Sequence, residues 1–300
     1  MPAIALIFNA FVWGVSWFPF RQIESHGVHP VWATCLIYTA ITLAMMLLRR
    51  SMWHVFVQHP GLALLGLAAG FTNVGFNWAV TQGDVVRVVL LFYLMPLWSV
   101  LLAWVVLGER PTLSALARVA LALVGVAVVL KTPETDWPMP TSLPDWLGVA
   151  AGFSFAVTNI LLRRLRNAPG ESRALAMFCG CALVAGATAL MGTALGAISP
   201  PPLAVPAWWG WALLLGIAFV FANVCLQYGA ARLAASATSV IMLSEVLFAS
   251  GSSVAFGAAA MDTRIWTGGA LIVLAALWSA FARSPADEDD RRSPLQKDMP

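Results

Sequence analysis

Two short stretches of the chain place the same polar side chains among apolar ones. Asn73 and Asn77 are four residues apart, and 150 residues later Asn223 and Gln227 have the same spacing. Residues four apart lie on one face of a helix, so each pair would present two carboxamides, which donate and accept hydrogen bonds, to one neighbour. Such a face either joins helices or binds the polar part of a small molecule. Its recurrence favours binding.

Further candidates for a binding site are aromatic or polar side chains in similar apolar stretches. Aromatic rings would contact the apolar part of a ligand, and amides or hydroxyls its polar part. Asn9 and Trp13 are four apart and would share one helix face. The full set of these candidates is Asn9, Trp13, Trp17, Trp78, Tyr93, Trp98, Tyr228 and Ser244.

Glu245 is the one acid deep inside an apolar stretch. An acidic side chain within a membrane is a candidate functional site, because its burial is costly. Three roles remain open for it: proton coupling, contact with an ammonium group, or a structural hydrogen bond while protonated.

The composition of the chain predicts that a bilayer is its solvent. Of its 300 residues, 60% are hydrophobic and 10% charged, and the mean hydropathy is +0.81. Soluble domains carry about 25% charged residues. The net charge of +3 is too small to indicate nucleic-acid binding. No P-loop, zinc-ligand pattern or nucleophile with a base is visible, so we expect no enzyme, no cofactor and no metal site.

Ten apolar runs are long enough to cross a membrane as helices, which need about 20 residues each. Short polar or proline-bearing connections separate them. The runs cover residues 3–20, 30–48, 60–80, 85–107, 113–130, 145–162, 173–196, 207–229, 236–257 and 265–282. Pro19 and Pro96 fall inside two of them and would free a backbone carbonyl, either to bind a substrate or merely to accompany a kink.

Basic residues in the connections predict the orientation, because cytoplasmic loops carry an excess of Lys and Arg. On the side shared with the amino terminus there are nine: Arg49, Arg50, Arg110, Arg163, Arg164, Arg166, Arg173, Arg232 and Arg283. On the other side there are four: Arg21, Arg87, Lys131 and Arg264. Arg118 lies inside the fifth run, near the side that holds the amino terminus. Both termini of this multi-pass membrane protein are therefore predicted to be cytoplasmic.

The two halves of the chain share further residues. Phe11 and Val15 match Phe153 and Val157 at an offset of 142. Five spans are an odd number, so the second five would enter the membrane from the opposite side, as in many secondary transporters. We expect an all-α membrane protein of two inverted five-helix repeats, at 1–130 and 145–282. The connection 131–144 joins them, and a disordered tail follows at 283–300.

Residues 93–112 read YLMPLWSVLLAWVVLGERPT, with a proline twelve residues before a Gly-Glu-Arg. This resembles the EamA signature of the drug/metabolite transporter superfamily. The first run, NAFVWGVSWFPFRQI, is also similar to the opening helix of that family. The second half departs from the pattern: Val246 follows Glu245 where the family often has proline, and Gly257-Ala258 replaces Gly-Glu. The resemblance spans about residues 1–282 and is greatest to bacterial aromatic amino-acid exporters of the YddG type.

The resemblance implies ten helices and a central substrate cavity. The leading hypothesis is a secondary transporter that exports small metabolites, aromatic or other neutral amino acids first among them, by alternating access. Its partners would be this small molecule and the lipid bilayer. A multidrug or cationic-compound exporter is the alternative, although the first run lacks the glutamate on which small members rely. In this scheme Asn77 and Trp78 would form the outer gate, and Gln227 and Tyr228 the inner one.

Overall fold

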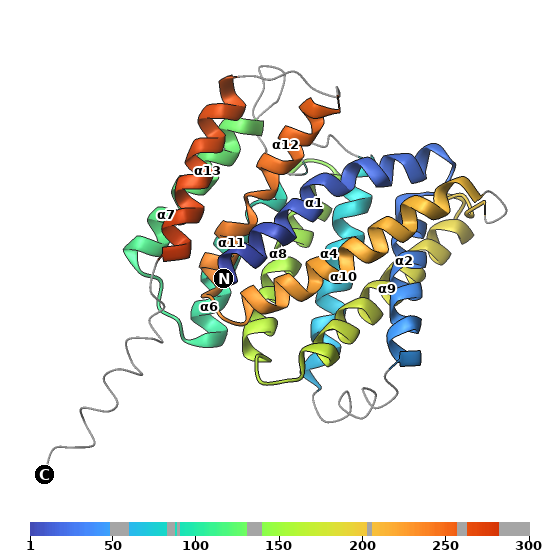
Figure 1. Ribbon diagram of the computed structural model, residues 1–300, viewed down its shortest axis with the longest axis horizontal. Helices are drawn as coiled ribbons and strands as arrows, with labels where there is room; N and C mark the ends of the chain where they lie inside the picture. Colours follow the sequence, from blue (N-terminus) through green and yellow to red (C-terminus); the bar gives the residue numbers. More distant parts are fainter. Residues whose placement is uncertain are drawn as a thin grey trace, which may run out of the picture.

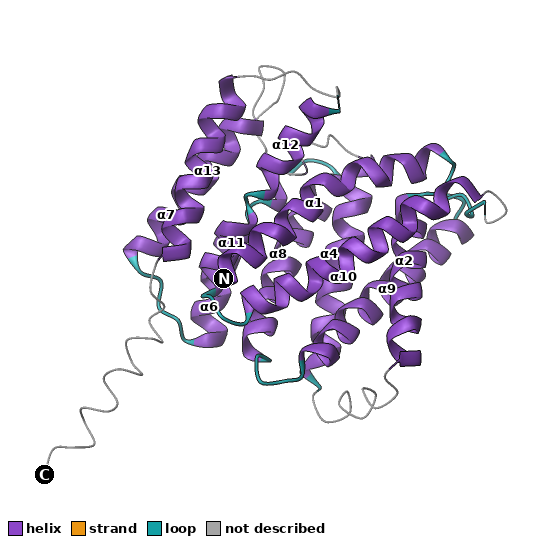
Figure 2. Cartoon of the chain, in the orientation of Figure 1, coloured by secondary structure: helices purple, strands orange, loops and turns teal. Residues whose placement is uncertain are grey.

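The computed structural model describes residues 1–48, 60–82, 88, 91–130, 140–202, 206–256 and 263–281. Within these ranges all regular structure is helical, as Figure 2 shows. The predicted tail at 283–300, most of the predicted connection at 131–144 and the Gly257-Ala258 pair lie outside them. The predicted all-helical fold is confirmed for the described residues.

The helices follow the apolar runs closely. In the first half they are α1 (Pro2–Ser25), α2 (Pro30–Leu48), α4 (Gly61–Gln82), α6 (Met95–Leu107) and α7 (Leu113–Leu130). In the second half they are α8 (Leu143–Arg164), α9 (Gly170–Ala194), the 3-10 turn η1 (Pro206–Trp208), α10 (Trp209–Ala230), α11 (Ala235–Met242), α12 (Glu245–Ala255) and α13 (Thr263–Phe281).

Most of these helices match the dimensions of a bilayer. Seven helical segments of the described chain are long and apolar enough to cross a membrane. Shorter apolar helices lie at Met95–Leu107, Leu113–Val128 and Trp266–Trp278. The prediction of a multi-pass membrane protein is therefore confirmed at this level.

Two predicted runs are interrupted rather than continuous. The run 85–107 turns at Tyr93 and Leu94 before α6 begins, and the run 236–257 turns at Leu243 and Ser244 between α11 and α12. Pro96 accounts for the first break, because proline lacks an N–H and fits the first turn of a helix but not its interior. The second break contains no proline, so the run gave no signal of it.

The two breaks have the same backbone pattern. The Leu94 carbonyl accepts from the N–H of Leu97 at 3.0 Å and of Trp98 at 3.3 Å. The Ser244 carbonyl accepts from Leu247 at 3.0 Å and from Phe248 at 3.4 Å. Leu94 and Ser244 are 150 residues apart, the spacing that also relates the two carboxamide pairs.

The Gly-Glu-Arg sequence ends α6 and links the two halves. Gly108 has a φ of 71°, a left-handed conformation that glycine adopts readily at the end of a helix, and the Glu109 N–H then donates to the Ala103 carbonyl at 3.1 Å. The Glu109 carboxylate accepts from Arg163 Nε at 2.6 Å, and Arg163 Nη1 donates to the Leu233 carbonyl at 2.6 Å. One arginine of α8 thus holds two connections.

Helices from different halves lie side by side. Figure 1 shows α1 beside α10 and the pair α7 and α13 at one edge, and α4 packs against both α8 and α9. The backbones of α4 and α9 nearly touch: a Cβ at Gly66 would clash with the Ala176 carbonyl oxygen. Gly216 is the residue of α10 that is 150 positions later, and a Cβ there would meet only Ile37 Cγ2 of α2, at 3.7 Å. The α4–α9 contact is therefore much tighter than the α10–α2 contact.

Candidate functional site

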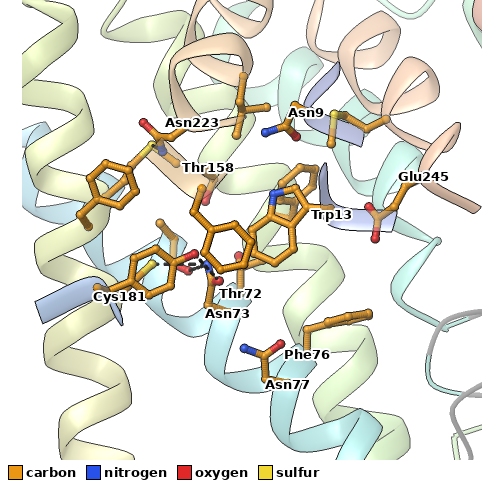
Figure 3. A pocket seen from close by; sticks show the side chains of 18 of the residues that line it. Asn9, Trp13, Thr72, Asn73, Phe76, Asn77, Thr158, Cys181, Asn223 and Glu245 are labelled. Carbon is orange, nitrogen blue, oxygen red and sulfur yellow. Dashed lines mark hydrogen bonds between the residues drawn. The ribbon is translucent and has the colours of Figure 1, made fainter. Parts of the chain in front are cut away.

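A cavity lies among helices of both halves. Its walls are mainly aromatic and aliphatic, with carboxamides, hydroxyls and one carboxylate between them, as Figure 3 shows. This mixture is typical of a site for a small molecule that has both polar and apolar parts.

Six of the thirteen site residues expected from the sequence line this cavity: Asn9, Trp13, Asn73, Asn77, Asn223 and Glu245. Seven do not: Trp17, Trp78, Tyr93, Trp98, Gln227, Tyr228 and Ser244. The cavity thus gathers two candidates of α1, both carboxamides of α4, one of the two carboxamides of α10 and the acid at the start of α12.

The carboxamides of α4 also join helices. Asn73 Oδ1 accepts from the Tyr38 hydroxyl at 3.0 Å, and Asn73 Nδ2 donates to Cys181 Sγ at 3.3 Å. Asn77 Nδ2 donates to Thr34 Oγ1 at 2.9 Å. The two roles left open by the sequence, interhelical bonding and cavity lining, therefore coexist in the same side chains.

The carboxamides of α10 are less alike. Asn223 lines the cavity, and its Nδ2 donates only to Met177 Sδ, a weak acceptor, at 3.4 Å. Gln227 is 4% exposed and faces the first turn of α9. Its Nε2 donates to Asn223 Oδ1 at 2.5 Å, and its side chain lies beside the Gly170 carbonyl and the Ala174 N–H.

Asn9 and Glu245 bring acceptor oxygens to the cavity. Asn9 Nδ2 donates to the Ala222 carbonyl at 2.7 Å, but no described residue donates a hydrogen bond to its buried Oδ1. The Glu245 side chain has no hydrogen bond or ion pair to any described residue, although Tyr93 lies close enough to interact with it electrostatically.

Trp13 stacks on Phe219 with ring centroids 4.8 Å apart. Figure 3 shows the Glu245 carboxylate pointing toward Trp13.

The aromatic candidates outside the cavity pack elsewhere. Trp17 Nε1 donates to Ser252 Oγ at 2.9 Å, between α1 and α12. Trp98 packs edge-on against Phe153, and Trp78 packs beside the cluster of Val31, Ala189 and Ile198. Tyr228 is 37% exposed, with the Arg232 guanidinium 4.0 Å from its ring centre. Tyr93 is buried against Phe92, and Ser244 is buried with an unpaired hydroxyl.

Several residues that line the cavity were not predicted from the sequence. Some of them are matched between the two halves of the chain at the offsets of 150 and 142 residues noted above, and these matches could have identified them. At 150, Ala69 pairs with Phe219, Phe76 with Leu226, and Phe92 with Met242. At 142, Trp13 pairs with Phe155. The others are Tyr38, Thr72, Thr158, Met177, Phe178 and Cys181. Position along the chain distinguishes none of these from ordinary core residues.

The chain resembles known proteins in sequence and in fold. The EamA-like transporter family matches residues 1–131. Protein RarD of Streptomyces exfoliatus is 28% identical over 161 residues, which are 52% of this chain and 47% of that protein, so the match spans about half of its length. A solved crystal structure, described simply as that of a protein, has 23% identity and a TM-score of 0.75 over 93% of this chain and 96% of its own. Residues 1–131 thus resemble the EamA-like transporter family in sequence, and nearly the whole chain has a fold already seen in a crystal.

Proposed function

We propose that this protein is a secondary transporter of the EamA type that exports small amphiphilic metabolites, with neutral amino acids, including aromatic ones, as the leading class. The observation that carries the proposal is the cavity, in which unpaired polar atoms lie among aromatic rings. The family match to residues 1–131 supports transport over binding alone. The membrane would be the bacterial inner membrane, with both termini cytoplasmic.

The unpaired atoms suit a zwitterion. Asn9 Oδ1 and the Glu245 carboxylate are acceptors without a described donor, and an ammonium group would satisfy them. Asn223 Nδ2 is held only by a sulfur atom and is the donor most easily given to a carboxylate. Trp13 and Phe76 would contact the apolar side chain.

Two inverted five-helix repeats, at 1–130 and 145–282, would give such a cavity two access states. The equal spacing of the helix breaks and of the paired lining residues supports this architecture. The unequal contacts support a state closed on one side. Gly66 and Gly216 would exchange surroundings in the other state, with α10 packed tightly on α2 and α4 released from α9.

A multidrug or cationic-compound exporter is the second candidate. The cavity holds the Glu245 carboxylate among aromatic rings, and no described cation pairs with it. The two candidate functions differ in whether the ligand carries a carboxylate that the site must bind. An amino-acid site needs Asn223 as a donor, whereas a cation site needs only Glu245 and the rings.

Competition in proteoliposomes tests the proposal. Uptake of a labelled aromatic amino acid should be inhibited by other neutral amino acids and not by quaternary ammonium compounds. Asn9→Leu and Asn223→Leu should each raise the half-inhibitory concentration about tenfold, because each removes one hydrogen bond to a charged group. Asn167→Leu, at an exposed position, is the matched control. Inhibition by quaternary cations alone would establish the second candidate instead.

A further inference from the structure

A second cavity lies where four helix ends meet. Its walls come from the end of α6, the start of α7, the start of α11 and the end of α13. The polar lining residues are Glu109, Arg110, Thr112, Ser114, Arg118, Arg232 and Ser236, and the apolar ones include Val100, Ala103, Trp278 and Phe281. It shares no residue with the cavity between the two halves.

Positive charge dominates this cavity. Arg110, Arg118 and Arg232 line it, and its one acid, Glu109, already accepts from Arg163 at 2.6 Å. Arg110 and Arg232 are exposed, whereas Arg118 is only 7% exposed. The cavity therefore has two cations at its surface and one within its wall.

Arg118 lacks the partner that a buried guanidinium needs. Its one hydrogen bond is from Nη1 to Ser114 Oγ at 3.4 Å, and no carboxylate of the described residues lies within ion-pair distance. A guanidinium has five N–H donors, and burying a charge without a counter-charge is unfavourable. An anion in the cavity would supply the missing acceptors.

The apolar side chains of the cavity indicate which kind of anion it would bind. Trp278 and Phe281 line the cavity while being 45% and 83% exposed. Exposed apolar side chains continue from them along α13, at Leu274 and Leu277. A ligand with an anionic head and a hydrocarbon tail fits such a surface, because the tail can remain in the bilayer while the head binds the arginines.

The position of the cavity fits the same ligand. The end of α10 lies beside the start of α1, since a Cβ at Gly229 would be 3.1 Å from the Pro2 carbonyl oxygen. The cavity is thus at the membrane face that holds the amino terminus, the face predicted to be cytoplasmic. Basic pockets between helices at that face bind anionic lipid head groups.

We propose that Arg110, Arg118 and Arg232 bind the phosphate head group of an anionic phospholipid, whose acyl chains lie along α13. Arginine suits phosphate because its planar fork of donors matches the phosphate oxygens. A competing occupant is the acidic run Asp287–Asp290, which follows Phe281 by six residues and lies outside the described residues. It offers charge but no apolar group for the exposed surface of α13, so the lipid is favoured.

Thermal stability of the full-length protein in detergent provides the test. Phosphatidylglycerol should raise the unfolding temperature more than phosphatidylcholine does, and the concentration for half of this effect measures affinity. Arg118→Gln and Arg232→Gln should each weaken the affinity about tenfold. Arg164→Gln, an exposed arginine at the same face that does not line the cavity, should leave it unchanged. Arg232→Gln serves alone if Arg118→Gln does not fold.

Three outcomes would overturn the proposal. Equal stabilisation by the two lipids would show that binding does not depend on the charge of the head group. An equal effect from water-soluble glycerol phosphate at the same concentration would assign the site to a free phosphate ion. Selective stabilisation that emerges only when Asp287–Asp290 are all changed to asparagine would show that the acidic run occupies the cavity instead.

Discussion

Glu245 is the residue on which coupling would depend. The sequence left three roles open for it, one of them a structural hydrogen bond. No described residue offers such a bond, and the carboxylate lines the cavity, so the structural role has no partner. Proton exchange and contact with an ammonium group remain, and both need the side chain to be accessible from the cavity.

Replacing Glu245 by glutamine separates these two roles. If Glu245 exchanges protons, the Glu245→Gln protein should lose uptake driven by a pH gradient, because an amide does not titrate, while substrate exchange without a gradient persists. Transport into proteoliposomes measures both. Glu24→Gln, at an exposed position near the end of α1, is the matched control. Equal activity of wild type and Glu245→Gln under a gradient would show that the protein is not driven through this residue.

The site was only partly predictable from the sequence, and the reason lies in the helices. Asn73 and Asn223 were identified because polar groups in apolar runs must face protein or a cavity. Trp17, Trp98 and Tyr228 were expected beside them but pack elsewhere. Apolar residues surround these helices on all sides, so periodicity does not distinguish the lipid-facing side from the inward side. Aromatic side chains, unlike amides, can face either the lipid or the interior of the bundle at little energetic cost.

At the level of elements, Arg163 joins α8 to the connection after α6 and to the one after α10. It is 9% exposed and pairs with Glu109. Arg163→Met should lower the free energy of unfolding by about 2 kcal/mol, because it removes a charged hydrogen bond and leaves Glu109 unpaired. Denaturation in detergent, compared between this variant and Arg164→Met at the neighbouring exposed site, measures the difference. An equal loss in both variants would mean that the ion pair contributes nothing specific.

The tight α4–α9 contact and the loose α10–α2 contact predict opposite effects of one substitution at two equivalent sites. Gly66→Ala would push α4 from α9, because its Cβ would clash with the Ala176 carbonyl, whereas Gly216→Ala fits the present surroundings. In the exchanged state the penalties would reverse. Each 1.4 kcal/mol of overpacking changes the ratio of the two states about tenfold.

Spin labels on exposed residues of α4 and α9 would record these shifts as distance distributions. Gly66→Ala should increase the population with a long α4–α9 distance, and Gly216→Ala should reduce it. Two substitutions that shift the distribution in the same direction, in a protein that still folds, would argue against an exchange of conformations between the halves.

For the whole molecule, composition and run length were sufficient to predict an all-helical membrane protein, since only bilayer spans need so many apolar residues. They did not predict the break at Leu243–Ser244, where no proline or glycine marks the turn. Nor did they predict the unequal contacts of Gly66 and Gly216, because both glycines lie in similar apolar sequence and differ only in how the bundle packs around them.

Orientation is the last property of the whole molecule, and it rests on nine basic residues on one side against four on the other. An excess of this kind favours the cytoplasm for the face that holds both termini. A reporter enzyme active only in the periplasm should therefore be inactive at the carboxyl terminus, and a fluorescent protein that folds only in the cytoplasm should be bright there. The same pair fused after residue 26, in the connection that follows α1, should give the reverse result. Periplasmic activity at the carboxyl terminus would invert the orientation, and with it the membrane face assigned to the arginine-lined cavity.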